Sequence, residues 1–456
     1  MPVRRVLIAN RGEIALRVIR ACRDLGVETV QVHSTADADT LPVRLADESV
    51  EIGGPSASES YLRGDAVIEA AKRTGADAVH PGYGFLSENA DFADACSAAG
   101  LTFIGPKGDV MRLMGDKAAA RSLAIDAGVP VTPGSREPIR DPNEAEEVAR
   151  TVGFPLLIKA SAGGGGRGMR VVEAEGDLRE TLERAAHEAE VSFGTRDVYI
   201  EKYLPTVRHV EVQVFGDGKA VLHFGERDCS VQRRHQKLVE ESPSLALTQA
   251  LREKITEAAC DLAARVGYEG AGTVEFIVDA AKQDFYFIEM NTRLQVEHPV
   301  TEAVTGVDLV KQQILLAGGA PLALAQEDIR FSGHAIECRI NAEDPKMGFM
   351  PKPGVLEECV LPAGPGIRVD SHVFPGYKLP PYYDSLLAKV IAWGQSRDEA
   401  LARMRRALAE FRIEGVPTTI AFHQRLLSDP EFLAGNVHTR YVREAMYAGH
   451  PMQQML

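Results

Sequence analysis

Short apolar runs alternate with helical patterns through about the first hundred residues, and this alternation constrains the fold more than any other feature. Strand-like runs are VLIA (6–9), TVQVH (29–33), SVEI (49–52), DAVH (77–80) and LTFIG (101–105). Helical patterns lie at 13–25, 67–72 and 92–99. In the first of these, Ile14, Val18, Cys22 and Leu25 recur at the spacing of one helix face. A series of βαβ units predicts a mostly parallel, doubly wound sheet.

Two polar segments follow strands of this predicted sheet, NRGE (10–13) and HPGYGFLSEN (80–89). Ligands of doubly wound sheets bind at the carboxyl ends of the strands, so these segments are candidates for a binding site. The alternative is that their glycine and proline residues only form the turns that connect helices and strands.

The remainder of the chain predicts two further units of different character. Residues from about 131 to 204 read as a small α/β unit, and the sequence becomes rich in strands from 205 onward. Long helical patterns lie at about 248–266 and at 397–411. We therefore expect a mixture of α/β and α+β structure, and 456 residues at roughly 150 per domain suggest about three units.

Charge and cysteine content exclude several functional classes. The chain carries 51 Lys and Arg against 65 Asp and Glu, a net charge of −14 that disfavours nonspecific binding to nucleic acids or anionic membranes. The six cysteines are scattered without a CxxC pair, so we expect reduced thiols in a cytoplasm. No apolar run is long enough to predict a signal peptide or a membrane span.

A run of glycines at 163–166 is the first candidate for chemistry. Gly163, Gly165 and Gly168 match GxGxxG, but a strand pattern follows instead of the helix that dinucleotide binding requires, and the GK[ST] ending of a Walker A loop is absent. Strand, glycine loop and strand predict a hairpin flap whose backbone N–H groups close over phosphates. The alternative is an exposed hairpin without a ligand. Lys159 and Lys117 could contact the same phosphates, or could simply reach solvent.

A predicted hairpin brings two carboxylates together. The strands GTVEFIVD and DFYFIEMN are joined by AAKQ, and a turn centred near position 282 places Glu275 opposite Glu289. Asn291 falls on the same face as Glu289. Opposed carboxylates in apolar surroundings are costly without a cation, and these three oxygen donors suit Mg²⁺ or Mn²⁺. A slip of one residue in register would instead turn one carboxylate to solvent.

The segment after Asn291 continues the same face with Arg293, Gln295 and Glu297. Arg293 could bind a small oxyanion, and Glu297 could accept a proton from it. The alternative is an ordinary surface alternation of charged and apolar residues.

A basic cluster and a single strand arginine complete the set of candidates. The cluster comprises Arg227, Arg233, Arg234, His235 and Lys237. It lacks interleaved aromatic residues, which favours an anionic small molecule over nucleic acid. Arg339 lies in the strand pattern HAIECRI and could be a structural residue paired with Glu337 or Asp344.

Taken together, the motifs resemble those of biotin carboxylase, an enzyme of the ATP-grasp superfamily. The resemblance covers nearly the whole chain and rests on IANRGEIALRVIRAC, HPGYGFLSENADFA, GDK, IKASAGGGGRGM, EKYL, RHVEVQV, ERDCSVQRRHQK, GTVEF, FYFIEMNTRLQVEHPVTE, ECRINAEDP and PPYYDSLLAKV. It implies an N-terminal domain at 1–114, an ATP-grasp domain at 115–330 with a lid at about 131–204, and a strand-rich C-terminal domain at 331–456.

The resemblance also implies roles for individual residues. The nucleotide contacts would be Lys117, Lys159, Gly165, Gly166, Glu201, Lys202, Leu204, His209, Gln232 and His235, with Gln232 also close to biotin. Glu275, Glu289 and Asn291 would bind two Mg²⁺ or Mn²⁺ ions. Bicarbonate would contact Lys237, Arg293, Gln295 and Val296, with Glu297 as the general base. Arg339 would stabilise the biotin enolate, and Tyr83 would help to frame the ureido ring. Ala162 departs from the family pattern, in which many relatives have another glycine.

The implied activity is carboxylation of biotin with ATP and bicarbonate through carboxyphosphate, the first half-reaction of acetyl-CoA carboxylase or of another acyl-CoA carboxylase. No Met–Lys–Met biotin-attachment motif appears, so we expect a homodimer that works with a separate biotin carboxyl carrier protein and with a carboxyltransferase subunit. Three alternatives remain open: the biotin carboxylase subunit of a two-subunit pyruvate carboxylase, another ATP-grasp carboxylate–amine ligase, and a catalytically silent nucleotide-binding subunit.

Overall fold

The N-terminal region forms the parallel sheet that the sequence predicts. The computed structural model describes residues 2–139, 141–160 and 168–447. Five parallel strands follow the order β3-β2-β1-β4-β5. Their bounds are β1 (Arg5–Ile8), β2 (Glu28–Ser34), β3 (Glu48–Gly53), β4 (Ala78–His80) and β5 (Thr102–Phe103). The prediction of a doubly wound sheet is confirmed, because alternate residues of β1 pack on opposite faces: Ile8 against α1 (Gly12–Asp24), and Leu7 on the side of α3 (Gly64–Thr74).

Helices α4 (Ala90–Ala98), α5 (Gly108–Gly115) and α6 (Lys117–Asp126) lead out of this sheet, and α6 begins where Asp116 accepts hydrogen bonds from the backbone of Ala118 and Ala119. The following unit is a three-stranded antiparallel sheet in the order β7-β6-β8, beside α7 (Pro142–Val152) and α8 (Leu178–Phe193). Its strands are β6 (Leu156–Ala160), β7 (Met169–Val172) and β8 (Val198–Lys202). The two strands of the predicted hairpin pair as expected, whereas the glycine run lies outside the described residues.

One antiparallel sheet of eight strands joins the middle and last thirds of the chain, in the order β13-β12-β9-β10-β11-β14-β21-β19. Its strands are β9 (Arg208–Asp217), β10 (Val221–Arg233), β11 (Gln236–Ser242), β12 (Glu269–Asp279), β13 (Asp284–Asn291), β14 (His334–Asn341), β19 (Ile367–Ser371) and β21 (Leu386–Gly394). The join is made by β11 and β14, with Val239 opposite Cys338. The sequence did not predict this pairing of two distant strands.

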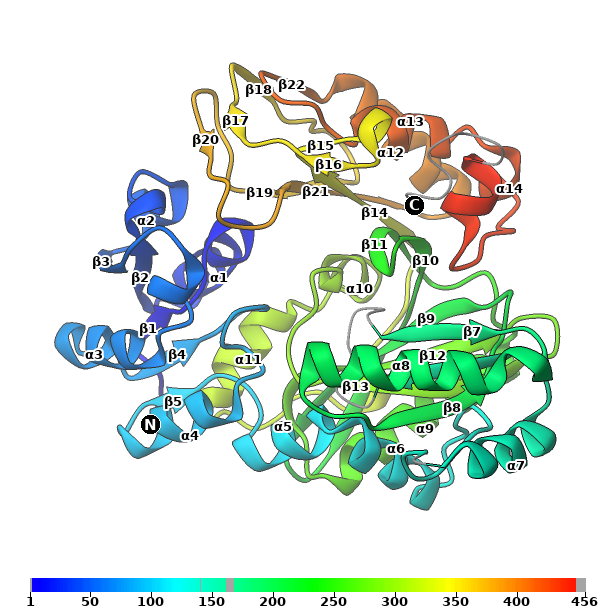
Figure 1. Cartoon of the computed structure of the whole chain (residues 1–456). Helices are drawn as coiled ribbons and strands as arrows, with labels where there is room; N and C mark the ends of the chain where they lie inside the picture. Colours follow the sequence, from blue (N-terminus) through cyan, green and yellow to red (C-terminus); the bar gives the residue numbers. More distant parts are fainter. Residues whose placement is uncertain (1, 140, 161–167, 448–456) are drawn as a thin grey trace.

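Helices pack against this sheet. They include α9 (Gln249–Arg265), α10 (His298–Thr305), α11 (Leu309–Ala317), α12 (Arg397–Glu410), α13 (Ile420–Leu426) and α14 (Pro430–Leu433). Four of these, α9 and α12 to α14, contribute to its two main cores. In Figure 1 the N-terminal sheet, the small lid-like unit with α7 and α8, and the C-terminal part of the large sheet lie around the strands β9 to β13. Among the described residues, no helix combines the length and the apolar character needed to cross a membrane.

The apolar segment GVLEECVL (354–361) forms two short strands. These are β17 (Gly354–Val355), paired with β20 (Lys378–Leu379), and β18 (Glu358–Val360), paired with β22 (Arg412–Glu414). Leu356 lies between them and is fully buried. The two halves find different partners, and Val355 and Val360 are exposed although the pattern is apolar.

An ion pair links the large sheet to α12 and predicts a pH-dependent stability. Arg397 Nε lies 2.7 Å from Glu241, which also contacts His334 at 2.9 Å. Burial acts to raise the pKa of Glu241, but the hydrogen bonds from Arg397 and His334 outweigh it and lower the pKa to about 2. Because the folded pKa lies below the ordinary value of 4.5, this stabilisation is complete above pH 4.5 and is lost as the pH falls toward 2.

We expect Glu241→Gln to lower the free energy of unfolding at pH 7 by about 3 kcal/mol, because Arg397 loses its buried partner. Thermal unfolding of both proteins between pH 7 and the acid limit measures this. The difference in Tm should shrink as the pH falls below 4.5, and a difference independent of pH would contradict the assignment.

Candidate active site

A cavity of about 1270 Å³ opens between the three regions, and it collects the predicted site residues. Tyr83 comes from the N-terminal sheet, Lys159 from the lid-like unit, His209 and Lys237 from the large sheet, and Arg339 from β14. Every residue to which the family resemblance gives a nucleotide, metal or substrate contact lines this cavity, apart from Gly165 and Gly166. Those two glycines, with Ala162, lie outside the described residues. The structure therefore brings the candidates together, while their individual roles stay predictions.

Several lysine side chains lie at one end of the cavity, beside the strands of the lid-like unit. Lys159 on β6 contacts the carboxylate of Glu201 on the neighbouring strand β8. Lys202 donates hydrogen bonds to the backbone carbonyls of Gly153 and Phe154, at 3.0 and 2.8 Å. Lys117, the first residue of α6, lies 4.0 Å from Glu289. Lys117 and Lys159 give this end of the cavity positive charge that suits a polyphosphate.

The predicted pairing of Glu275 with Glu289 is confirmed. β12 and β13 pair with Glu275 directly opposite Glu289, and the connection is the predicted AAKQ segment. Glu275 accepts hydrogen bonds from Asn291 Nδ2 at 3.0 Å and Gln295 Nε2 at 3.1 Å, and its other oxygen lies 3.1 Å from His209 Nε2. The alternative register, in which one carboxylate turns to solvent, does not occur.

The two opposed carboxylates have opposite pKa shifts. Burial acts to raise the pKa of Glu275, but Lys237 and His209 outweigh it and leave the pKa well below its ordinary value. Burial and the charge of Glu275 both raise the pKa of Glu289. The hairpin therefore carries negative charge that its neighbours compensate more fully at Glu275 than at Glu289, and a divalent cation would relieve the remainder.

The donor set fits such a cation. Glu275 and Glu289 offer carboxylate oxygens and Asn291 offers an amide oxygen, which now accepts a hydrogen bond from Arg293 at 3.1 Å. Hard oxygen ligands suit Mg²⁺ or Mn²⁺. His209 and Glu211 also place ligand atoms within 4.8 Å of one another and of Glu275, so the acidic centre extends beyond the three predicted ligands.

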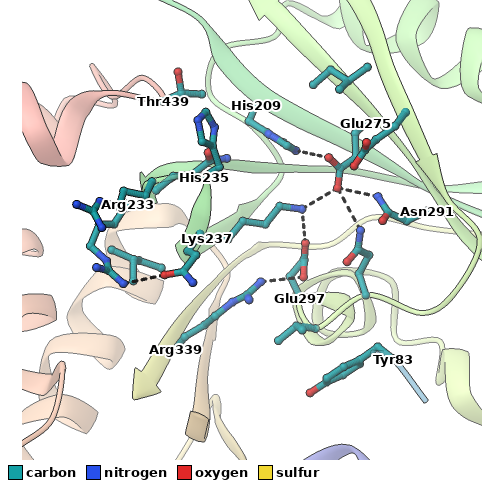
Figure 2. A pocket seen from close by; sticks show the side chains of 18 of the residues that line it. Tyr83, His209, Arg233, His235, Lys237, Glu275, Asn291, Glu297, Arg339 and Thr439 are labelled. Carbon is teal, nitrogen blue, oxygen red and sulfur yellow. Dashed lines mark hydrogen bonds and ion pairs between the residues drawn. The ribbon is translucent and has the colours of Figure 1, made fainter. Parts of the chain in front are cut away.

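Lys237 is the electrostatic centre of the cavity. Its Nζ lies 3.0 Å from Glu275 and 2.6 Å from Glu297 (Figure 2). It makes a still shorter contact with Glu211. Burial acts to lower the pKa of Lys237, but Glu211 and the other two carboxylates outweigh it and raise the pKa well above its ordinary value. One ammonium group therefore compensates three buried carboxylates.

Glu297 and Arg339 form the other half of this cluster. Glu297 is fully buried at the N-cap position of α10, and Arg339 Nη2 lies 2.9 Å from its Oε2. Burial acts to raise the pKa of Glu297, but Lys237 and Arg339 lower it well below its ordinary value. The alternative pairing of Arg339 with Glu337 or Asp344 is wrong, because its second partner is Glu240, whose Oε1 lies 2.7 Å from Nε.

Arg293 lies beside this cluster and is held by side chains on both sides. Its Nε donates to Glu88 at 2.8 Å, and Nη1 donates to Gln295 Oε1 at 2.8 Å. The guanidinium group is thereby fixed at the cavity wall with Gln295 and Val296. This arrangement suits a small planar oxyanion between Arg293 and Lys237.

The basic cluster divides in two. Arg233, Arg234, His235 and Lys237 line the cavity, but Arg227 does not. Arg227 is fully buried and bonds Glu211, Gln213, Thr273 and Thr301. The prediction that Arg227 belongs to a site for anions is wrong, because its side chain points inward from β10 and is buried. Arg227 fixes Glu211, which the sequence did not single out, although Glu211 is the one carboxylate in the strand pattern HVEVQVF.

Three family models match successive parts of the chain. They are described as "Biotin carboxylase, N-terminal domain" over residues 2–111, "Carbamoyl-phosphate synthase L chain, ATP binding domain" over 116–325, and "Biotin carboxylase C-terminal domain" over 337–444. Together they cover nearly all of the described structure.

Named relatives and a solved structure match over almost the same length. "Biotin carboxylase 1" of Bacillus subtilis is 54% identical over 96% of this chain and 98% of its own length. A pyruvate carboxylase subunit of Methanothermobacter thermautotrophicus is 52% identical over 96% of this chain and 89% of its own. A crystal structure of the biotin carboxylase domain dimer of Hydrogenobacter thermophilus 2-oxoglutarate carboxylase, in complex with MgADP, ADP and bicarbonate, has a TM-score of 0.92. It is 49% identical, over 98% of this chain and 99% of that one.

Proposed function

The chain belongs to the biotin carboxylase family and is an ATP-dependent ligase that carboxylates biotin, and we propose that the cavity around Lys237 is where it does so. The observation that carries this proposal is the cluster of Lys237, Glu297 and Arg339, in which a buried carboxylate lies between two cations at the wall of a large cavity. Such a carboxylate can take a proton from a bound anion that the same cations hold.

We propose that ATP lies with its phosphates toward Lys117 and Lys159 and with its base near Glu201, Lys202 and Leu204, where His209, Gln232 and His235 also line the wall. Glu275, Glu289 and Asn291 would hold Mg²⁺ or Mn²⁺. Bound there, the metal would neutralise negative charge on the phosphates during phosphoryl transfer. Support comes from the acidic hairpin and from the bound MgADP of the structural relative.

Bicarbonate would bind between Lys237 and Arg293, beside Gln295 and Val296. Glu297 removes its proton, and the freed oxygen attacks the γ-phosphate of ATP to give carboxyphosphate and ADP. Carboxyphosphate decomposes to carbon dioxide and phosphate, and the phosphate takes the N1 proton of biotin. Arg339 then stabilises the biotin enolate, which attacks carbon dioxide, while Tyr83 frames the ureido ring. Enclosure of the cavity keeps water from the labile intermediate.

The biological setting is also a proposal. Biotin would be presented on a separate carrier protein and passed to a carboxyltransferase subunit, with this chain acting as a homodimer in the cytoplasm. The six unpaired cysteines and the dimer of the structural relative support this setting. We propose acetyl-CoA or another acyl-CoA as the final acceptor, and pyruvate as the alternative that the Methanothermobacter relative favours. We also propose domains at 1–114, 115–330 and 331–456, which the ranges of the three family models support.

The direct test is ATP cleavage by the purified protein with free biotin, bicarbonate and Mg²⁺, with each component omitted in turn. We expect release of ADP and phosphate to fall at least tenfold without biotin, bicarbonate or metal, because each takes part in or enables the coupled reaction. A carboxylate–amine ligase would instead turn over with an amine in the absence of both biotin and bicarbonate. Tight ATP binding without any turnover would indicate a silent nucleotide-binding subunit.

A further inference from the structure

A buried ion pair at the wall of the cavity joins the first and last thirds of the chain. Lys389 on β21 is fully buried, and its Nζ lies 3.1 Å from Glu13 Oε1 at the start of α1. Glu13 is itself 4% exposed. Removing a lysine and a glutamate from water is costly, and their mutual attraction seldom repays that cost in stability. Neither residue has a part in the chemistry proposed above.

Lys389 makes a second contact that leads directly to the proposed base. Its Nζ donates a hydrogen bond to the backbone carbonyl of Val296 at 2.8 Å. Val296 immediately precedes Glu297, so the ammonium group fixes the peptide from which the carboxylate projects. The carbonyl belongs to the segment between β13 and α10, which has no sheet partner of its own among the described residues.

The strand register places Lys389 next to Arg339. The two residues lie directly opposite each other on β21 and β14, so their side chains share one face of the sheet. Arg339 contacts the carboxylate of Glu297, and Lys389 contacts the carbonyl one residue earlier. Two neighbouring cations therefore hold two consecutive residues, one by its side chain and the other by its backbone.

Glu13 extends this arrangement to the opposite wall. The hydroxyl group of Tyr83 donates a short hydrogen bond to the same Glu13 oxygen that contacts Lys389. The ring of Tyr83 has its centre 5.8 Å from Lys389 Nζ and lies below Glu297 in Figure 2. Tyr83, Glu13, Lys389 and Val296 thus form one continuous chain of contacts from the proposed biotin wall to the proposed base.

We propose that Lys389 and Glu13 are positioning residues for the carboxylation reaction: Lys389 fixes the Val296 carbonyl and thereby Glu297, and Glu13 fixes Lys389 and Tyr83 in their relative places. This inference rests on the proposed function, because it concerns the positions that Glu297 and Tyr83 take in the proposed reaction. It predicts a loss in kcat that is separate from any loss of folding.

The test compares Lys389→Met with the double variant Lys389→Met/Glu13→Gln. The single variant leaves the Glu13 carboxylate buried without its cation, so both Tm and kcat should fall. The double variant removes both charges and should recover most of the Tm. Its kcat for biotin- and bicarbonate-dependent ATP cleavage should stay about a hundredfold below wild type, with KM for ATP changed by less than about threefold, because the bond to Val296 is still missing.

A matched control is Arg397→Met, which breaks a buried ion pair of the same sheet away from the cavity and should lower Tm with kcat unchanged. Recovery of kcat together with Tm in the double variant would overturn the proposal, since the ion pair would then serve stability alone. The proposal would also be overturned if the KM for ATP rose by the same factor as kcat fell.

If neither Lys389 variant folds, Glu13→Gln provides the test, because it keeps the hydrogen bond from Lys389 to Val296. The kcat for ATP cleavage is then measured with and without biotin. An equal loss of kcat in the two assays would contradict the assignment of Glu13 as the residue that positions Tyr83 for biotin. An inactive wild-type protein would instead refute the proposed function itself.

Discussion

Glu297→Gln is expected to reduce bicarbonate-dependent ATP cleavage by about a thousandfold, because the amide keeps the shape of the side chain but cannot accept the proton of bicarbonate. The wild-type carboxylate has the negative charge that this role requires. Lys237 and Arg339 outweigh its burial and hold the pKa of Glu297 well below its ordinary value, so the group is ionised throughout the neutral range. The release of phosphate with and without bicarbonate measures the effect.

The matched control lies on the same helix. Glu302→Gln makes the same change at a buried carboxylate of α10 that contacts Arg17 and Arg368 instead of the cavity. It should leave the rate within a few-fold of wild type, and both variants should bind ATP as wild type does, measured by calorimetry. Full activity of Glu297→Gln would show that another group accepts the proton.

Local patterns predicted much of the fold and of the site. The alternation of strands and helices was sufficient for the parallel N-terminal sheet, since each βαβ unit is contiguous in sequence. The pairing of Glu275 with Glu289 followed from one short connection, because a hairpin's turn fixes its register. Arg293 and Glu297 followed from their continuity with that hairpin. These inferences needed only neighbours close along the chain.

Contacts between distant segments could not be predicted in this way. Glu240 meets Arg339 only because β11 pairs with β14, about a hundred residues later in the chain. Lys389 reaches Val296 through the pairing of β14 with β21. Arg227 looked like a surface cation because a run of basic residues follows it at 233–237, but its side chain points inward from the strand and is buried. The periodicity of a strand predicts which of its side chains share a face. Which distant residues those side chains contact depends on tertiary packing.

Lys237→Met is the second change for which we expect a very large effect, on both activity and stability. The variant loses the only side chain that contacts Glu211, Glu275 and Glu297 together among the described residues. Three carboxylates then lie close together, which should cost about 3 kcal/mol of folding free energy at neutral pH. Activity should fall by about a thousandfold, because the proposed bicarbonate site loses its ammonium group.

The pH dependence distinguishes this cause from a loss of packing. Without Lys237 the carboxylates are less favourable as anions, so their folded pKa values should rise above their unfolded values. Groups shifted in that direction lose stability as the pH rises, and the Tm deficit of Lys237→Met should therefore be larger at pH 8 than at pH 5.5. Glu211→Gln in the same chain should restore part of the Tm but none of the activity.

Lys107→Met supplies the comparison, since Lys107 pairs with Glu269 at an exposed position where an ion pair contributes little. Its Tm and activity should match wild type at both pH values. If the deficit of Lys237→Met did not change with pH, the lysine would act through its packed aliphatic stem. Arg227, His209 and Arg339, which contact Glu211, Glu275 and Glu297 respectively, would then compensate the three carboxylates.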